Sequence, residues 1–255
     1  MADAWSAMVA RAVVALPLGL AACGSSGDPT GGVLRVLFIG NSLTYANDLP
    51  GMLSDLADQV AGGPRIEARD VSNPDYALED HWANPSSVDA LDEGGWDVVI
   101  LQQGPSSLPE NQVNLREWAT RFADRIRAVG GTPALYMVWP DVTRLSFFDA
   151  VSVSYRNAAV AADADLYPAG EAWRAAWAED SSLPLYGNDG FHPSVMGTYL
   201  AALTIYHTLA QRSVVGLAAP TGVSGEAADI LQRAAERAVM EFGRREERVS
   251  SGAAR

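Results

Sequence analysis

A serine near the start of the chain and an aspartate–histidine pair far downstream have the types and spacing that nucleophilic catalysis requires. Ser42 follows an apolar run, within Gly40–Thr44 (GNSLT), while Asp189 and His192 stand three residues apart in a glycine-containing loop. A carboxylate on one imidazole nitrogen leaves the other nitrogen to accept a serine proton. These three side chains could therefore act together if the fold brings their loops into contact.

Each motif also has an ordinary structural explanation. The segment Asn41–Ser42 could be a turn or a helix cap, because short polar residues are favoured in both places. In the same way, Asp189–Gly190 could be a plain turn and His192 could cap the helix that follows. The catalytic interpretation therefore depends on the elements that position these loops.

Those elements alternate between strand-like and helix-like patterns. Short apolar, β-rich runs predict buried strands, and apolar residues at helical spacing predict helices. The expected strands are 33–39, 65–71, 96–101, 133–139 and 165–167, and the expected helices are 48–61, 110–129, 147–163, 194–212 and 225–247. Strands separated by such helices predict one domain with a parallel sheet covered on both faces. Ligands bind beyond the carboxyl ends of the strands in sheets of this kind.

Composition indicates a folded protein and argues against a protein that binds nucleic acid. The chain has 255 residues, of which 48% are hydrophobic and 19% charged, so a folded domain with a large core is expected rather than disorder. Its formal net charge of −13 disfavours a nucleic-acid partner, because the phosphate backbone carries the same sign.

The chain has a single cysteine, Cys23, so it cannot form an intramolecular disulfide. The position of Cys23 near the start of the chain carries the more useful information. It follows the apolar stretch 12–22, which is too short to span a bilayer and has the size of a signal-peptide core. The sequence LAACG resembles a bacterial lipobox, which implies lipidation of Cys23. We therefore expect a signal peptide at 1–22, a flexible tether at 23–32 and a lipid-anchored protein exported to the bacterial cell envelope, on the periplasmic or cell-surface side. A plain secretory signal, or a buried segment with an incidental cysteine, is the alternative.

Two motifs taken together resemble the SGNH (GDSL-like) hydrolase superfamily. The segment Gly40–Thr44 is similar to the first block of that family, although Asn41 stands where Gly-Asp-Ser is more common. The segment Asp189–Ser194 (DGFHPS) is similar to the last block, in which Asp-x-x-His supplies acid and base from one loop. The order of the two blocks also fits, and the resemblance covers about residues 33–212.

The resemblance implies a fold and a set of catalytic residues. The implied fold is α/β: a three-layer α/β/α sandwich with a central, mostly parallel five-stranded sheet of flavodoxin type, within a domain at 33–248. The implied catalytic residues are Ser42, Asp189 and His192, and no metal or other cofactor is implied.

The family also holds the reacting oxyanion with donors in its middle blocks. The backbone N–H of Ser42 would be one donor, and a glycine in the second block usually supplies another. Here Asp75 is the nearest counterpart of that glycine, and its backbone N–H could serve. Gln102 or Gln103 would replace the family's asparagine amide, with Gln102 preferred because it lies nearer the strand end. Alternatively, both glutamines only satisfy loop backbone groups.

Four further residues are candidates for substrate binding. Asn41 adjoins the serine, His81 and Trp82 follow the second strand, and Trp139 ends the fourth strand. A tryptophan at the rim could stack on a sugar or an acyl chain, although packing of both aromatic rings in the core is the alternative. A metal site at His81 is not expected, because no second histidine stands at ligand spacing.

The function these residues predict is a serine esterase that hydrolyses small acyl esters, with acetyl esters on carbohydrate or cell-envelope glycans favoured, through an acyl-enzyme intermediate. One alternative is an esterase for lipids or short acyl chains, of lysophospholipase or thioesterase type. Another is a catalytically weak ligand-binding lipoprotein on the same scaffold. The expected partners are the ester substrate and the membrane reached through the N-terminal anchor.

Overall fold

The computed structural model describes residues 32–242. The expected signal peptide, Cys23 and almost all of the expected tether lie outside the described residues, as do residues 243–248 at the end of the expected domain.

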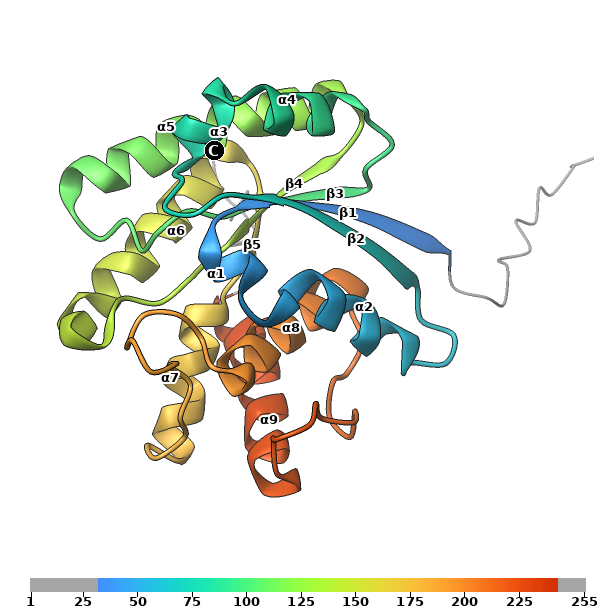
Figure 1. Ribbon diagram of the computed structural model, residues 1–255, viewed down its shortest axis with the longest axis vertical. Coiled ribbons are helices and arrows are strands. Elements are labelled where there is room, and N and C mark those ends of the chain that lie inside the picture. Colours follow the sequence, from blue (N-terminus) through green and yellow to red (C-terminus); the bar gives the residue numbers. More distant parts are fainter. Residues whose placement is uncertain (1–31, 243–255) are drawn as a thin grey trace, which may run out of the picture.

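A single five-stranded sheet forms the centre of the molecule (Figure 1). Its strands are β1 (Val33–Gly40), β2 (Arg65–Ser72), β3 (Val98–Leu101), β4 (Thr132–Tyr136) and β5 (Asp165–Tyr167). They pair in the order β2-β1-β3-β4-β5, and every pairing is parallel. From β1 the chain first adds β2 on one side and then β3, β4 and β5 on the other side. The junction between β1 and β3 is therefore a topological switch point, the place where such sheets bind ligands.

Helices cover both faces of the sheet and make three layers (Figure 1). One face carries α3 (Leu78–Ala83), α4 (Pro85–Asp92), α5 (Pro109–Ala128) and α6 (Phe148–Ala162). The other face carries α2 (Leu49–Asp58) and α8 (Val195–Ala210), with α7 (Ala169–Glu179) and α9 (Gly225–Phe242) packed against α8. Three short elements lie in the connections: α1 (Ser42–Tyr45), and the 3₁₀ segments η1 (Ala46–Asp48) and η2 (Val142–Phe147). The expected fold class is confirmed.

Burial explains why these segments fold as they do. The last five residues of β1 and all of β3 are buried, as expected for strands covered on both faces. Helix α8 is apolar around most of its circumference, because it lies between the sheet and three other helices. Together these elements build a rigid core whose strand ends are fixed in space.

Candidate active site

Ser42 lies at the carboxyl edge of the sheet, where β1 ends at Gly40 and α1 begins. The turn is tight: a Cβ at Gly40 would overlap Thr44 Oγ1 and Gln102 Oε1, so this position cannot hold a larger residue without a shift. Asn41 caps the helix, since its side-chain oxygen accepts the N–H of Leu43 at 3.1 Å. The turn therefore places Ser42 as the first helical residue at the rim.

The structure brings Ser42, His192 and Asp189 into one hydrogen-bonded chain. His192 Nε2 lies 2.8 Å from Ser42 Oγ, and His192 Nδ1 lies 2.5 Å from Asp189 Oδ2. These loops are 150 residues apart in sequence and meet at the same edge of the sheet. We call this arrangement the Ser–His–Asp chain.

The carboxylate of Asp189 orients the imidazole with both of its oxygens. Oδ2 contacts the ring, and Oδ1 accepts the backbone N–H groups of Phe191 and His192, each at 2.9 Å. The hydrogen bond from His192 and those from the backbone lower the pKa of Asp189 to about 2. A carboxylate that stays ionised can hold the Nδ1–H tautomer, which leaves Nε2 as the acceptor that faces serine.

Contacts within the Asp–His loop fold it back on itself. Gly187 N donates to His192 O at 2.7 Å, and Gly190 adopts a φ of +72°, a conformation that favours glycine. Asn47, on the serine side, donates its amide to Pro193 O at 2.9 Å and so links the two loops. Sequence reasoning missed Asn47; the signal is a short polar residue of the kind that tolerates its positive φ of 53°.

Exposure makes the Ser–His–Asp chain accessible from one side. Ser42 is 7% exposed as a residue, while the side chains of His192 and Asp189 are 41% and 53% exposed. Ser42 is thus largely buried, while the imidazole that contacts its hydroxyl is exposed to solvent.

Asp75 lies in the turn after β2, exposed and with a φ of 60°. This left-handed conformation favours glycine, which agrees with Asp75 standing where the resembling family has one. The next residue, Tyr76, accepts the side-chain amide of Asn41 at 3.0 Å, so this turn contacts the serine turn. The oxyanion role of the Asp75 backbone N–H stays a prediction.

Gln102 is not placed as an oxyanion donor would be, and this corrects the sequence-based preference. Its amide nitrogen donates to Asn41 Oδ1 at 2.9 Å and to Gln103 O at 2.7 Å, which uses both hydrogens. Its side-chain oxygen accepts from Asn41 N and Thr44 Oγ1. Gln102 is completely buried and serves the serine turn instead.

Gln103 is 3% exposed and is also engaged in its loop. Its oxygen accepts the N–H of Leu78 at 3.0 Å, and its amide donates to Ser106 Oγ at 2.8 Å. One amide hydrogen remains beyond these two bonds. The oxyanion role of Gln103 therefore stays a prediction.

Asn41 and His81 do not reach a substrate in this arrangement. Asn41 is 6% exposed; its side-chain oxygen accepts from Leu43 N and Gln102 Nε2, and its amide nitrogen donates to Tyr76 O. His81 is 0% exposed, with Nδ1 at 2.7 Å from Ser87 Oγ and Nε2 at 2.8 Å from the carbonyl oxygen that ends β1. The expectation that these two side chains bind substrate is therefore corrected: they shape the turn from behind.

The two candidate tryptophans are packed, as the alternative interpretation had it. Trp82 lies edge-on to Phe122 and tilted against Trp118, both on α5. Trp139 is fully buried and stacks on Trp173 with ring centroids 3.5 Å apart. Full burial corrects the expected stacking of Trp139 on substrate, while Trp82 is half-buried and its role in substrate binding stays a prediction.

Trp139 nevertheless supports the site from below. Its indole N–H donates to Phe191 O at 3.0 Å. Phe191 lies between Asp189 and His192 in the Asp–His loop. Beside it, Val142 N donates to Gly190 O at 2.8 Å. The segment after β4 thus holds the Asp–His loop in place.

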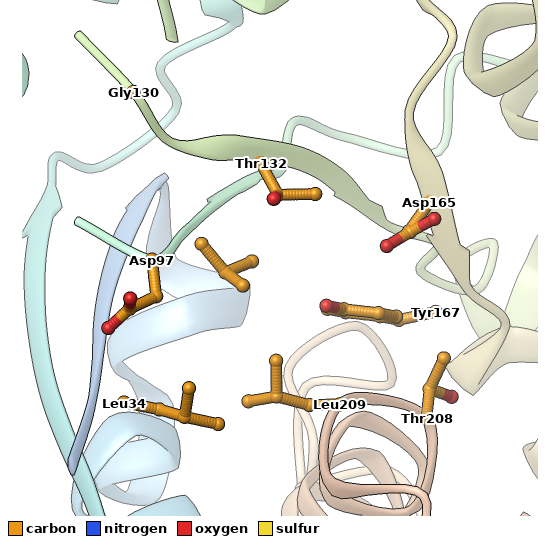
Figure 2. Close-up of a pocket in the computed structure, with 9 residues that line it drawn as sticks. Leu34, Asp97, Gly130, Thr132, Asp165, Tyr167, Thr208 and Leu209 are labelled. Atoms are coloured by element: carbon orange, nitrogen blue, oxygen red, sulfur yellow. The ribbon is translucent and has the colours of Figure 1, made fainter. Parts of the chain in front are cut away.

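A cavity of about 410 Å³ lies at the opposite edge of the sheet (Figure 2). It is lined by residues at the amino ends of the strands, including Leu34, Asp97, Thr132 and Asp165, and by Leu209 near the end of α8. The sheet separates this cavity from the Ser–His–Asp chain. We place the candidate site at the carboxyl edge, where the nucleophile and its base are in contact.

Within residues 32–242, no group of three His, Cys, Asp or Glu side chains is arranged to hold a metal ion. Over the same residues, no helix is both long and apolar enough to cross a membrane.

Comparison with known proteins adds structural relatives. No protein-family model and no curated protein sequence matches the chain. Among solved structures, it is similar to a DUF4886 family protein from Bacteroides uniformis, with a TM-score of 0.73 and 19% identity over 83% of this chain and 96% of that one. It is also similar to a putative SGNH hydrolase from Slackia heliotrinireducens, with a TM-score of 0.60 and 26% identity over 69% and 99% of the two chains.

An acetylxylan esterase from Geobacillus stearothermophilus matches with a TM-score of 0.52 and 16% identity, over 69% of this chain and 95% of that one. At 16% and 19% identity, the likeness to the Geobacillus and Bacteroides proteins is one of fold. On its fold and its structural relatives, the chain is a member of the SGNH-like hydrolase superfamily.

Proposed function

We propose that this protein is a serine esterase that removes small acyl groups, with acetyl groups on carbohydrate or cell-envelope glycans as the favoured substrates. The structural relatives, which are hydrolases and esterases, support ester hydrolysis in general. The observation that carries the proposal is the 2.8 Å contact between Ser42 Oγ and His192 Nε2, with Asp189 on the other ring nitrogen.

In the proposed mechanism, Ser42 Oγ attacks the ester carbonyl while His192 Nε2 takes the hydroxyl proton. The imidazolium, stabilised by Asp189, then gives that proton to the leaving alcohol, which leaves an acyl group on Ser42. Water, deprotonated by His192, attacks the acyl-enzyme; the bond between the acyl carbon and Ser42 Oγ breaks, His192 returns the proton to Oγ, and the carboxylic acid leaves. Each half-reaction returns the imidazole to its starting state.

The oxyanion formed in both half-reactions needs donors near Ser42. The N–H of Ser42 lies in the first turn of α1, where helix geometry provides no intrahelical acceptor. We propose this N–H as the first donor, the Asp75 backbone N–H as the second and the remaining Gln103 amide hydrogen as the third. Losing one such donor typically costs about 10²–10³-fold in rate.

A glycan substrate is supported by the acetylxylan esterase among the structural relatives and by the open, solvent-facing imidazole. Short lipid esters are the second candidate, and one observation favours them. Val142, Leu145 and Phe147 are exposed on η2, which is bonded to the Asp–His loop through Val142 N. A panel of acetylated glycans and short-chain acyl lipids, compared by kcat/KM, would decide between the two.

The test of the nucleophile is the Ser42→Ala variant. We expect it to lose p-nitrophenyl acetate hydrolysis while its circular dichroism spectrum and Tm stay close to those of the wild type. Ser86→Ala is the matched control, because Ser86 is an exposed serine on α4. Wild-type turnover by the Ser42→Ala variant would show that Ser42 is not the nucleophile.

Labelling with a fluorophosphonate separates an esterase from a ligand-binding protein on the same scaffold. The probe reacts covalently with an activated serine, so we expect the wild type to be labelled and Ser42→Ala to be unlabelled. Folded wild-type protein that takes no label would favour the binding protein.

A further inference from the structure

The peptide unit that precedes the nucleophile turn is held at both ends by buried side chains. It joins Gly40 to Asn41: its carbonyl oxygen lies 2.8 Å from His81 Nε2, and its N–H donates to Gln102 Oε1 at 2.9 Å. His81 and Gln102 come from different segments, α3 and the loop after β3, and both are 0% exposed. We call this arrangement the peptide clamp.

The tautomer of His81 follows from its neighbours. A carbonyl oxygen can only accept, so Nε2 must carry a hydrogen and donate it to Gly40 O. Burial lowers the pKa of His81, which favours the neutral ring. Nδ1 then accepts from the hydroxyl of Ser87, which is itself fully buried. The ring is thus fixed as a donor to the peptide, and a second N–H, from Asn73, reaches the same carbonyl at 3.1 Å.

Gln102 makes two hydrogen bonds to Asn41, the second residue of this peptide unit. Its oxygen binds the Asn41 main chain, and its amide nitrogen binds the Asn41 side-chain oxygen at 2.9 Å. The same side-chain oxygen of Asn41 caps α1, whose first residue is Ser42. With Thr44 and Gln103 as its other partners, the amide uses all four of its hydrogen-bonding positions.

The missing side chain at Gly40 is what lets this clamp close. A Cβ there would overlap the oxygen of Gln102, so the amide could not reach the peptide. The Gly40–Asn41 peptide and the Asn41 side-chain oxygen are both held, so Asn41 is restrained on its main chain and its side chain, and its φ and ψ set the placement of the Ser42 N–H and Cα. Misplacing a reacting group by about 1 Å can cost about 10²-fold in rate.

We propose that His81 and Gln102 are positioning residues for Ser42, which together lock the Gly40–Asn41 peptide and so aim the nucleophile at the ester carbon and its N–H at the oxyanion. The inference rests on the proposed function of Ser42. It assigns Gln102 a role different from direct oxyanion binding, and it gives His81 a role although the ring never meets substrate.

The first experiment compares His81→Phe with His81→Gln. Phenylalanine keeps a ring and removes the donor, while glutamine carries an N–H at nearly the position of Nε2. We expect His81→Phe to lower kcat about 10²-fold with KM changed less than about threefold. His81→Gln should recover at least tenfold of that loss. A merely structural role predicts parallel losses of stability for both variants without this recovery of kcat.

The second experiment uses Gln102→Glu and a pH profile. A protonated glutamic acid can still accept from Asn41 N and donate to Asn41 Oδ1, whereas the carboxylate would face that oxygen and Gln103 O with no hydrogen to offer. Burial raises the pKa of such a carboxyl, and its partners, Asn41, Thr44 and the Gln103 main chain, are neutral. Two titratable groups share partners with it: the Tyr155 hydroxyl donates to the same Gln103 O at 2.6 Å, and His81 holds the other end of the clamped peptide. Burial raises the pKa of Tyr155 and lowers the pKa of His81, so both groups favour the neutral form. We therefore expect the ratio of variant to wild-type kcat to fall as pH rises from about 6 to 9. A ratio that does not change with pH in folded protein would overturn the role of Gln102.

Gln232→Leu is the matched control for burial. Gln232 is 1% exposed on α9 and donates to Tyr199 Oη at 2.9 Å and to Leu217 O at 2.7 Å, away from the serine turn. Its loss should lower Tm and leave kcat within about twofold of wild type. The same effect from Gln102→Leu, a lower Tm with unchanged kcat, would contradict the proposal.

Ser42→Ala, measured beside these variants, keeps the two proposals distinguishable. If Ser42→Ala keeps full activity, the proposed function fails. If it is inactive while His81→Phe and Gln102→Glu are folded and keep wild-type kcat, only the peptide clamp fails. A readout without catalysis is the ¹⁵N NMR spectrum of His81, which should show the neutral Nε2–H tautomer; the Nδ1–H tautomer would overturn the proposed role of His81.

Discussion

At the residue scale, one short loop supplies both the acid and the base. Asp189 divides its two oxygens between the imidazole of His192 and the loop backbone, so the orientation of the ring depends on a single carboxylate. The three-residue spacing made this pairing predictable from the sequence. The inward direction of Gln102 was not predictable, because a glutamine at a strand end can turn toward the cleft or toward the turn behind it.

Replacing Asp189 with asparagine should lower kcat by about 10³–10⁴-fold, since an amide favours the wrong tautomer of the base. The backbone N–H groups of the loop could still bind the side-chain oxygen, so we expect little change in fold. Asp180→Asn is the control, because Asp180 makes a similar bond to the N–H of Ser182 at 2.9 Å on another exposed turn. Steady-state kinetics on p-nitrophenyl acetate measure the effect, and a loss of less than about tenfold would argue against Asp189 as the orienting group.

The pKa of Asp189 gives a second prediction at this scale. It is lowered to about 2, chiefly by the hydrogen bond from His192, from an ordinary value of 3.8. A lowered folded pKa means that the carboxylate adds stability above about pH 4, and that this contribution disappears as pH falls toward 2. In a His192→Gln variant the pKa should move up toward 3.8. Carboxyl ¹³C shifts followed against pH would show it, and an unchanged pKa would mean that the imidazole contact is not its main cause.

At the scale of elements, buried parallel strands were the most predictable part. All five expected strands exist. β3 and most of β1 are compact apolar runs in the covered sheet, whereas β2 is an edge strand with charged residues and one buried position, Ile66. The expected strand 96–101 begins only at Val98, and Trp96 before it donates its indole N–H to Ala90 O.

Besides the one-turn α1, three helices of the described residues were not predicted. Helices α3 and α4 are short and are separated at Asn84–Pro85, which hides their periodicity. Helix α7 buries mainly alanines and Trp173, whose partner Trp139 lies on a distant segment. Its stability therefore comes from a tertiary contact that no local pattern contains.

That contact leads to an element-scale prediction. Trp139→Phe removes the indole N–H that holds Phe191 O, and this should lower the free energy of unfolding by about 1–3 kcal/mol. We expect kcat to fall severalfold as well, because the Asp–His loop loses support from the segment after β4. Trp177→Phe is the control: it loses a similar bond, to Leu183 O at 3.0 Å, on a turn that carries no catalytic residue. Chemical denaturation and steady-state kinetics together test this, and equal kcat in both variants would contradict it.

At the scale of the whole molecule, we propose attachment to the membrane through a lipid on Cys23. Cys23→Ser should move the protein from the membrane fraction to the soluble fraction of cells. Its kcat on a soluble ester should stay within about twofold of wild type, because the described domain holds the whole proposed site. Fractionation followed by activity measurement checks both parts. Retention of the serine variant in the membrane fraction would show that another feature anchors the protein.

The direction of β1 has a consequence for where such an anchored enzyme could work. The chain enters the sheet at Val33 and reaches Ser42 only after running the full length of β1, which is 8 residues or about 25 Å at the rise of a strand. The point where an anchoring segment would join the domain and the reactive rim are therefore at opposite edges of the sheet. Esters on polymers that extend away from the lipid surface could reach the serine without the domain turning over, whereas esters embedded in the host bilayer would require the domain to turn its far edge toward the lipid.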